Sequence, residues 1–279
     1  MNRRSAILCP QCRKLVNADE EQCPYCGISR PGAGWRHMFG SLGGFNAETA
    51  YTYLLYLNVG MYVLSLLLSP TRIGMVPNPL TFLSPSGAGL ELLGSTGWVP
   101  VVHGGRWWTL LTANYLHGGI LHIFFNMAAM RQLLPLVTRE FGLNRTVVIY
   151  TIGGVLGFVV SCLAHIPWTI GASAALCALI GALLYYGRNR GGTYGQAVFR
   201  TVWGWALSVM VFGFLIPGIN NWAHGGGMAA GFLLAAGLGY REKVRETRLH
   251  RNLSTACVVA TLAALGWGVL GAVAYRLLG

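Results

Sequence analysis

Seven long apolar runs, separated by short clusters of charged residues, constrain this chain more than any other feature. A helix needs about 20 mostly apolar residues to cross a membrane. The candidate spans are Ala50–Ser69, Trp107–Leu136, Arg145–Ile166, Gly171–Gly187, Ala197–Ile216, Asn221–Tyr240 and Thr255–Leu278. Only 10% of the residues are charged, whereas a soluble domain usually has about 25%. The sequence therefore predicts an all-α polytopic membrane protein and excludes a soluble enzyme, a disordered chain and a disulfide scaffold. Pro135 is expected to end or kink the second span.

The formal net charge of +12 has two interpretations: the basic residues bind nucleic acid, or they set the topology of a membrane protein. The basic residues lie in short clusters between the apolar runs, which is typical of topology signals, so we expect no nucleic-acid partner. With the N-terminus in the cytoplasm, 17 of the 20 Lys and Arg residues fall at or near the inner side. Only Arg72, Arg106 and Arg276 fall outside, and seven spans then place the C-terminus outside.

The spans divide the chain into three regions. Residues 1–45 form a polar, cysteine-containing head, and residues 46–242 contain six spans. Residues 243–279 contain a basic linker and the seventh span. Within the core, residues 70–106 form a long outer loop rich in proline and glycine. A loop of this length is usually functional or disordered, and its apolar residues favour a place against the membrane surface or the bundle.

Two C-x-x-C pairs stand in the head, Cys9–Cys12 and Cys23–Cys26, and Gly27 follows the second pair. Four thiolates at such spacing can hold one tetrahedral zinc ion. The reducing cytoplasm favours zinc over disulfides. The alternatives are a redox dithiol and loop cysteines without a ligand role. A site with four cysteine ligands leaves no open position, so we interpret it as a structural, zinc-ribbon-like module that docks a cytoplasmic partner.

Polar residues inside three of the spans mark a candidate site, because polar groups in lipid usually face the bundle interior. They are His117, His122 and Asn126 in the second span, Gly171 and Ser173 in the fourth, and His224, Gly227 and Gly231 in the sixth. A helix rises about 1.5 Å per residue. His122, Asn126, Ser173 and His224 then lie ~20–26 Å from the cytoplasmic charge that ends each span, so they share one depth near the outer surface.

A serine hydroxyl at this depth becomes a nucleophile only if a base takes its proton. His224 is the candidate base, and the glycines on its helix face allow a neighbouring helix to approach closely. The backbone N–H of Ser173, with His122 and Asn126, would stabilise an oxyanion. None of the eight acidic residues lies at this depth, which leaves a Ser–His dyad. The alternatives are a packing role for Ser173, a structural or pathway role for His224, and a His117 side chain that snorkels to the outer interface.

These residues resemble the rhomboid family of intramembrane serine proteases over Ala50–Tyr240. The resemblance rests on H-x4-H-x3-N at 117–126, G-x-S at 171–173 and H-x-x-G-x-x-x-G at 224–231. It implies a six-helix core with a water-filled cavity open to the outside, and cleavage of membrane-anchored substrates near their outer boundary. It makes Ser173 the nucleophile, makes His224 the base, and places His122 and Asn126 in the oxyanion hole. It implies no active-site metal, and the seventh span matches the six-plus-one form.

Three positions depart from the family pattern. Ala174 stands where glycine commonly follows the serine, Cys177 stands where a tyrosine often packs on the histidine, and Thr109 follows Trp108 where the family has arginine. These departures motivate a second hypothesis, a catalytically weakened rhomboid-like protein that binds or escorts membrane proteins. A transporter or channel is a third hypothesis, disfavoured because no acidic residue lies in the middle of a span.

Overall fold

The computed structural model describes residues 6–9, 14–32, 47–69 and 82–278. The chain separates into two compact units, Met1–Ala50 and Tyr51–Gly279. In the first unit, strands β1 (Ala6–Leu8) and β2 (Leu15–Asn17) pair antiparallel, with Leu8 opposite Leu15. Cys9, Val16 and Cys23 form its small buried centre. A core of this size supplies little folding energy on its own.

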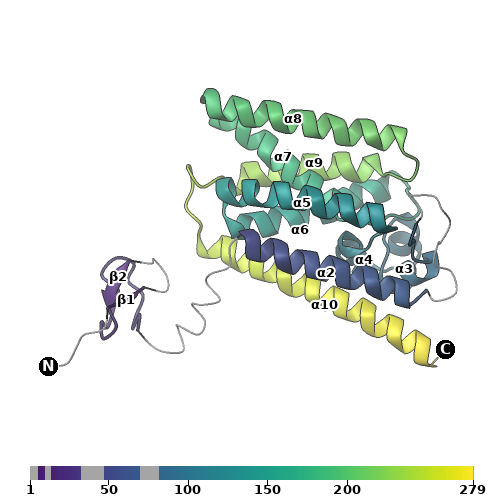
Figure 1. Ribbon diagram of the computed structural model, residues 1–279, viewed down its shortest axis with the longest axis horizontal. Coiled ribbons are helices and arrows are strands. Elements are labelled where there is room, and N and C mark those ends of the chain that lie inside the picture. Colours follow the sequence, from purple (N-terminus) through teal and green to yellow (C-terminus); the bar gives the residue numbers. More distant parts are fainter. Residues whose placement is uncertain (1–5, 10–13, 33–46, 70–81, 279) are drawn as a thin grey trace. The chain divides into compact units, whose positions relative to one another are not determined.

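The second unit is a bundle of helices (Figure 1). Within the described residues, the helices of 18 residues or more are α2 (Ala47–Leu67), α5 (Ile120–Phe141), α6 (Leu143–Leu163), α7 (Ser173–Arg190), α8 (Gly192–Leu215), α9 (Asn221–Leu238) and α10 (Arg248–Leu278). In Figure 1, α8 lies at one edge of the bundle and α10 at the other. The most extensive contacts join α6, α7 and α9, which form the centre.

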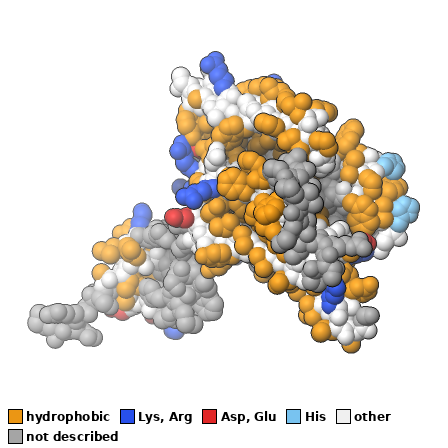
Figure 2. Space-filling model, turned by 45° about the vertical axis from the view of Figure 1, so that its right-hand side comes forward, with side chains coloured by type: hydrophobic (Ala, Val, Ile, Leu, Met, Phe, Trp, Pro, Cys, Tyr) orange, Lys and Arg blue, Asp and Glu red, His pale blue; other side chains and the backbone are white. Residues whose placement is uncertain are grey.

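Five of these helices, among the residues described, are long and apolar enough to cross a membrane, namely α2, α5, α6, α8 and α10. Helices α7 and α9 have 18 residues each, and both make their most extensive contacts with each other and with α6. Hydrophobic side chains cover much of the visible surface of the bundle in Figure 2. Trp203, Phe212 and Trp267 are among the exposed ones. The prediction of an all-α polytopic membrane protein is confirmed.

The predicted second span, Trp107–Leu136, is wrong in its bounds. Residues before Ile120 form the short helix α4 (Thr109–Thr112) and the 3-10 turn η3 (Ala113–Tyr115), and α5 then continues through Pro135 to Phe141. Proline within a membrane helix is tolerated because neighbouring groups satisfy the freed carbonyl. The last helix also begins seven residues earlier than the predicted Thr255.

The loop that the sequence places on the outer side carries ordered structure over its described part, from residue 82 onward. It contains helix α3 (Gly87–Leu93) and the π-helical turn η2 (Val99–His103). Arg106 donates from Nη2 to the carbonyl oxygen of Glu91 at 2.7 Å, and its guanidinium lies 5.0 Å from the ring centre of Trp108. Both α3 and α4 contact α10. The loop therefore packs against the bundle, as its apolar content predicts.

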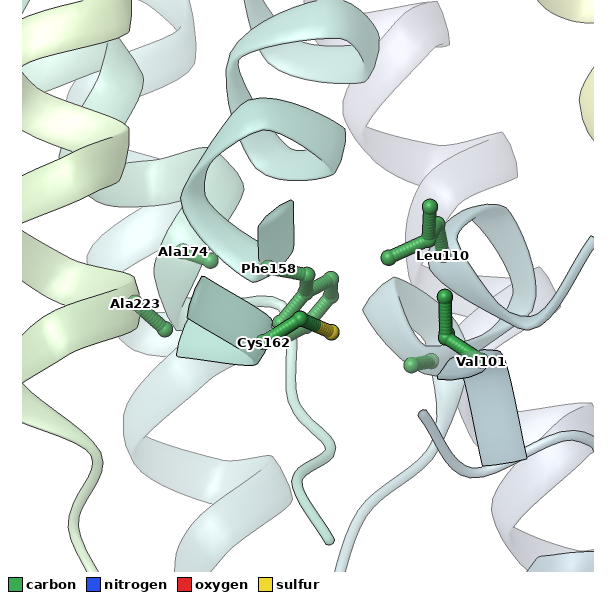
Figure 3. Close-up of a cluster of buried hydrophobic side chains, with 7 residues drawn as sticks. Val101, Leu110, Phe158, Cys162, Ala174 and Ala223 are labelled. Atoms are coloured by element: carbon green, nitrogen blue, oxygen red, sulfur yellow. The ribbon is translucent and has the colours of Figure 1, made fainter. Parts of the chain in front are cut away.

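A buried cluster joins the segment 99–113 to the central helices (Figure 3). Its members are Val101, Leu110, Ala113, Phe158, Cys162, Ala174 and Ala223. Phe158 of α6 lies between Ala174 and Leu110 in Figure 3. Ala174 and Ala223 are the chain neighbours of Ser173 and His224, so packing in this cluster fixes the backbone beside both candidate catalytic residues.

Candidate active site

The structure brings Ser173 and His224 together from two helices. Ser173 is the first residue of α7, and His224 lies in the first turn of α9. The Oγ atom of Ser173 and the Nε2 atom of His224 are 2.8 Å apart, within hydrogen-bond distance. The other ring nitrogen of His224, Nδ1, is buried and has no hydrogen-bond partner among the described residues. Over the described residues, the arrangement is therefore a serine–histidine pair with no acid behind the imidazole.

Glycines on α9 permit this contact. A Cβ atom on Gly227 would collide with the carbonyl oxygen of Ala174, and a Cβ on Gly231 would collide with that of Ala178. Gly157 of α6 lies against the same stretch of α9. A Cβ atom on Gly157 would lie 3.1 Å from the backbone nitrogen of Gly227. The backbones of α7 and α9 thus approach more closely than side chains would allow.

The His122 ring borders the space in front of the serine. The backbone N–H of Gly118 donates to His122 Nδ1 at 3.2 Å, so the neutral ring carries its proton on Nε2. A Cβ on Gly171 would lie 2.7 Å from His122 Nε2 and 3.6 Å from Ser173 Oγ. The two atoms therefore face one small space, which exists because residue 171 is glycine. The Gly171 φ angle of +123° also disfavours other residues.

The other predicted residues of α5 lie nearby. Asn126 is buried, and its Nδ2 donates to the carbonyl oxygen of His122 at 2.9 Å. His117 is fully buried, with its ring centre 5.0 Å from that of His122. The alternative of a His117 side chain that snorkels to the interface is therefore wrong, because residues 113–117 pack inside the protein.

Asn220 links the segments that carry Ser173 and His224, through contacts that the sequence did not lead us to expect. Its Oδ1 accepts from the backbone N–H of Ala223 at 3.1 Å and so caps α9. Its Nδ2 donates to Ser161 Oγ at 2.6 Å and to Thr169 Oγ1 at 3.0 Å. The side chain thereby joins the start of α9 to α6 and to the segment before Ser173. An asparagine directly before a helix is a recognisable capping signal.

The segment before Ser173 is held by backbone pairing with the outer segment. Thr96 and Thr169 exchange N–H to carbonyl hydrogen bonds of 3.1 Å and 2.6 Å. The N–H of Gly171 donates to the carbonyl oxygen of Ala113 at 2.8 Å. No pattern of alternating residues marks this short pairing, so it cannot be predicted from the sequence.

The three residues that depart from the family pattern are all buried. The Ala174 side chain is fully buried in the cluster of Figure 3. Cys177 is buried beside α9, where a Cβ on Gly227 would lie 3.4 Å from the Cys177 Cβ. Thr109 Oγ1 donates to the carbonyl oxygen of Arg106 at 2.7 Å and lies 3.0 Å from Thr96 Oγ1. Each of these side chains fits its site without displacing Ser173 or His224.

The head holds a group of thiols suited to a metal. The sulfur atoms of Cys9, Cys23 and Cys26 all lie within 4.8 Å of one another, and those of Cys9 and Cys26 are 3.7 Å apart. Zn–S bonds of about 2.3 Å in a tetrahedron place sulfur atoms about 3.8 Å apart, so the group fits zinc. Gly27, with φ of +73°, completes the turn after the second pair. Cys12, the fourth predicted ligand, lies outside the described residues.

Comparison with known proteins places the central helices in a family domain. A model of the Rhomboid domain matches residues 104–241. RHOMBOID-like protein 7 of Arabidopsis thaliana is 35% identical over 159 residues, covering 56% of this chain and 50% of the relative. Rhomboid protease GluP of Bacillus subtilis (strain 168) is 34% identical over 135 residues, covering 48% of this chain and 27% of the relative.

A further relative is described as inactive. Inactive RHOMBOID-like protein 8 of Arabidopsis thaliana is 32% identical over 173 residues, covering 61% of this chain and 48% of the relative. The chain spans half or less of the length of these three curated relatives. The matched residues 104–241 include α4 to α9 and the Ser173–His224 pair. This multi-pass membrane protein carries a rhomboid domain and belongs to the rhomboid family.

Proposed function

We propose that this chain is an intramembrane serine endopeptidase that cleaves proteins anchored by a transmembrane helix. The observation that carries the proposal is the 2.8 Å separation of Ser173 Oγ and His224 Nε2 on adjacent helices. Ser173 Oγ attacks the scissile carbonyl carbon while its proton passes to His224 Nε2. The imidazolium then protonates the leaving amine nitrogen, which leaves an ester on Ser173. Water hydrolyses this ester, with His224 again taking and returning the proton.

The negative charge that develops on the carbonyl oxygen needs hydrogen-bond donors to stabilise it. The first N–H groups of a helix have no partner within the helix, and Ser173 begins α7. His122 Nε2 carries a proton and faces the space beside Ser173, and Asn126 lies one helical turn further along α5. We assign the Ser173 N–H, His122 and Asn126 to the oxyanion hole. His117, Gly171, Gly227 and Gly231 support this site by packing. The chemistry needs no metal.

The topology that accompanies this proposal places the N-terminus in the cytoplasm and the C-terminus outside. Arg139 and Arg190 lie at the end of the bundle distant from Ser173, and basic residues favour the cytoplasmic side. Ser173 then lies toward the outer side, and cleavage takes place near the outer boundary of a substrate helix. The protein acts within the lipid bilayer, and its partners are membrane proteins.

A second candidate function is binding or escort of membrane proteins by a weakened active site. The departures at Ala174, Cys177 and Thr109 and the inactive relative favour it. Against it, Ala174 is accommodated in the buried cluster of Figure 3, and Ser173 and His224 remain at hydrogen-bond distance. We therefore favour the active protease.

The deciding experiment uses the full chain in proteoliposomes with a reporter protein that has one transmembrane segment. The wild type is expected to cleave the reporter, and Ser173→Ala is expected to leave it intact. Ser208→Ala is the matched control, because Ser208 is an exposed serine on α8 that donates to the Gly204 carbonyl oxygen of its own helix. Cleavage by Ser173→Ala equal to that of wild type would reject the protease, whereas reporter binding without cleavage by wild type would support the escort function.

For the head we propose one structural zinc ion held by Cys9, Cys12, Cys23 and Cys26. The close grouping of the three described thiols supports this proposal, and the metal would supply folding energy that the small core lacks. The folded head would then present a surface to a cytoplasmic partner.

A further inference from the structure

A charged cleft lies at the other end of α7 from Ser173. It has a volume of about 460 Å³ and is lined by Arg139, Glu140, Arg190, Tyr194, Arg241 and Glu242. Arg190 ends α7 and Ser173 begins it, so some 18 helical residues, or ~27 Å, separate the cleft from the candidate active site. The cleft is thus a separate feature that the proposed proteolysis does not use.

One carboxylate of the cleft, that of Glu140, is paired inside the protein. The Glu140 side chain is only 7% exposed. Its Oε1 accepts from the Tyr194 hydroxyl at 2.7 Å and from Arg139 Nε at 3.0 Å. The backbone N–H of Arg241 donates to the Glu140 carbonyl oxygen at 2.8 Å. Glu140 therefore balances Arg139 and holds the start of the Arg241 segment in place.

The other carboxylate is paired as well. Arg190 Nε donates to both oxygens of Glu242, at 2.9 Å and 3.2 Å. Two carboxylates are thus matched to two arginines. The Arg241 side chain is exposed, and in the part of the chain that the structure describes its guanidinium forms no hydrogen bond or ion pair. The cleft therefore has one positive charge in excess.

Two of the three arginines in the cleft, Arg139 and Arg190, also contact an aromatic ring that fixes their positions. The guanidinium carbons of Arg139 and Arg190 lie 5.3 Å and 4.8 Å from the centre of the Tyr194 ring, at distances where cations bind an aromatic face. Fixed guanidinium groups recognise phosphate oxygens through paired hydrogen bonds. A site with an uncompensated cation and two ordered arginines suits a phosphate group better than a cation or an apolar ligand.

We propose that this cleft binds the phosphate group of an anionic phospholipid. The cleft lies where α5 ends and α8 begins, and both helices are long and apolar enough to cross the membrane. Lipid headgroups are found at that level, and basic pockets between membrane helices are suited to anionic headgroups. Basic side chains lie along the left edge of the bundle in Figure 2. Inorganic phosphate has the same chemistry, so the test separates the two sources.

The test measures lipid binding to the full chain in detergent by native mass spectrometry, with phosphatidylglycerol and phosphatidylcholine as probes. The wild type is expected to retain phosphatidylglycerol in preference to phosphatidylcholine. Arg241→Gln is expected to weaken phosphatidylglycerol binding about fivefold, as for loss of one cation near a headgroup. Arg241→Gln with Arg190→Gln is expected to weaken it further. Arg251→Gln is the matched control, because Arg251 is exposed near the start of α10 and does not line the cleft.

Equal phosphatidylglycerol binding by wild type and the double variant would overturn the proposal, as would an equal loss in Arg251→Gln. Competition with inorganic phosphate identifies the source. If millimolar phosphate leaves the bound lipid in place, the headgroup is the ligand. If phosphate binds alone and displaces the lipid, the cleft is a phosphate site and the assignment to a lipid is wrong. None of these readouts depends on proteolysis, so failure here is distinguishable from failure of the proposed protease.

Discussion

Gly227 on α9 faces the carbonyl oxygen of Ala174 on α7 with no room for a side chain between them. Ala174 follows Ser173, and Gly227 lies one helical turn after His224. The distance between the two helices at this point therefore sets the distance between the hydroxyl and the imidazole. A pair held in this way depends on helix packing, since no carboxylate orients His224 Nδ1 among the described residues.

Gly227→Ala is expected to abolish reporter cleavage and to lower the free energy of unfolding by about 1–3 kcal/mol, the usual cost of overpacking. The added methyl group must push α9 away from α7 and separate Ser173 from His224. Thermal unfolding and cleavage in proteoliposomes measure the two effects. Gly225→Ala is the control, because a Cβ at Gly225 meets nothing within 4 Å. Full activity in Gly227→Ala would contradict the dependence of the site on this helix contact.

Gly171→Ala tests the space shared by His122 and Ser173. A Cβ at this position would lie 2.7 Å from His122 Nε2, so the ring must move. We expect cleavage to fall by about 10²-fold or more, as for loss of one oxyanion donor. Gly218→Ala is a close control, since Gly218 also has a positive φ, +90°, but has open space around it. Both variants carry a backbone cost of about 1–2 kcal/mol, so a similar loss of activity in both would point to strain alone.

The sequence predicts the helices and the site residues because both follow from local chemistry. A helix that crosses lipid needs a long apolar run, and a polar side chain inside the membrane usually belongs to a functional site. Residues 107–119 show where this logic fails. Leu110 and Ala113 are as apolar as residues that face lipid, but they are buried in protein, within the short helix α4 and the 3-10 turn η3. Composition cannot distinguish burial in protein from burial in lipid.

Contacts between segments that lie far apart in the chain cannot be predicted from this sequence either. The basic residues at the ends of α5 and α7 are read from sequence as topology signals, and their spacing gives no hint that Arg139 and Arg190 share the Tyr194 ring. Asn220 is recognisable as a helix cap, but its bonds to Ser161 and Thr169 depend on how three segments meet.

Asn220→Ala is expected to lower the free energy of unfolding by about 1 kcal/mol through loss of the α9 cap. It is also expected to slow cleavage about ten- to a hundredfold, because the start of α9 and the segment before Ser173 lose their common anchor. Asn220→Ser separates these effects, since serine retains the cap but is too short to reach Ser161 and Thr169. Asn189→Ala is the control at the far end of α7. Wild-type cleavage by Asn220→Ser would show that only the cap matters.

The zinc proposal predicts close to one zinc ion per chain in the purified protein. Cys9→Ser with Cys23→Ser is expected to lose most of this zinc, because two buried ligands are removed and hydroxyl groups bind zinc poorly. Elemental analysis of equal amounts of protein gives the ratio. Cys257→Ser is the control, since Cys257 lies on α10 in the other unit. An unchanged zinc content in the double variant would refute the site.

Ser173 and His224 are expected to act as one unit, which a double-variant cycle and covalent labelling test together. Each of Ser173→Ala and His224→Ala is expected to lower cleavage by about 10⁴-fold or more, and the double variant to lose no more than either one, because a nucleophile without its base contributes little. A serine-reactive fluorophosphonate is expected to label wild type at Ser173 and to label His224→Ala much more slowly. His165→Ala is the control, since this exposed histidine packs against Trp98, with their ring centres 4.1 Å apart, and lies outside the Ser173–His224 pair. Additive losses in the cycle, or equal labelling of wild type and His224→Ala, would mean that the imidazole does not activate the hydroxyl, and the 2.8 Å contact would then serve packing alone.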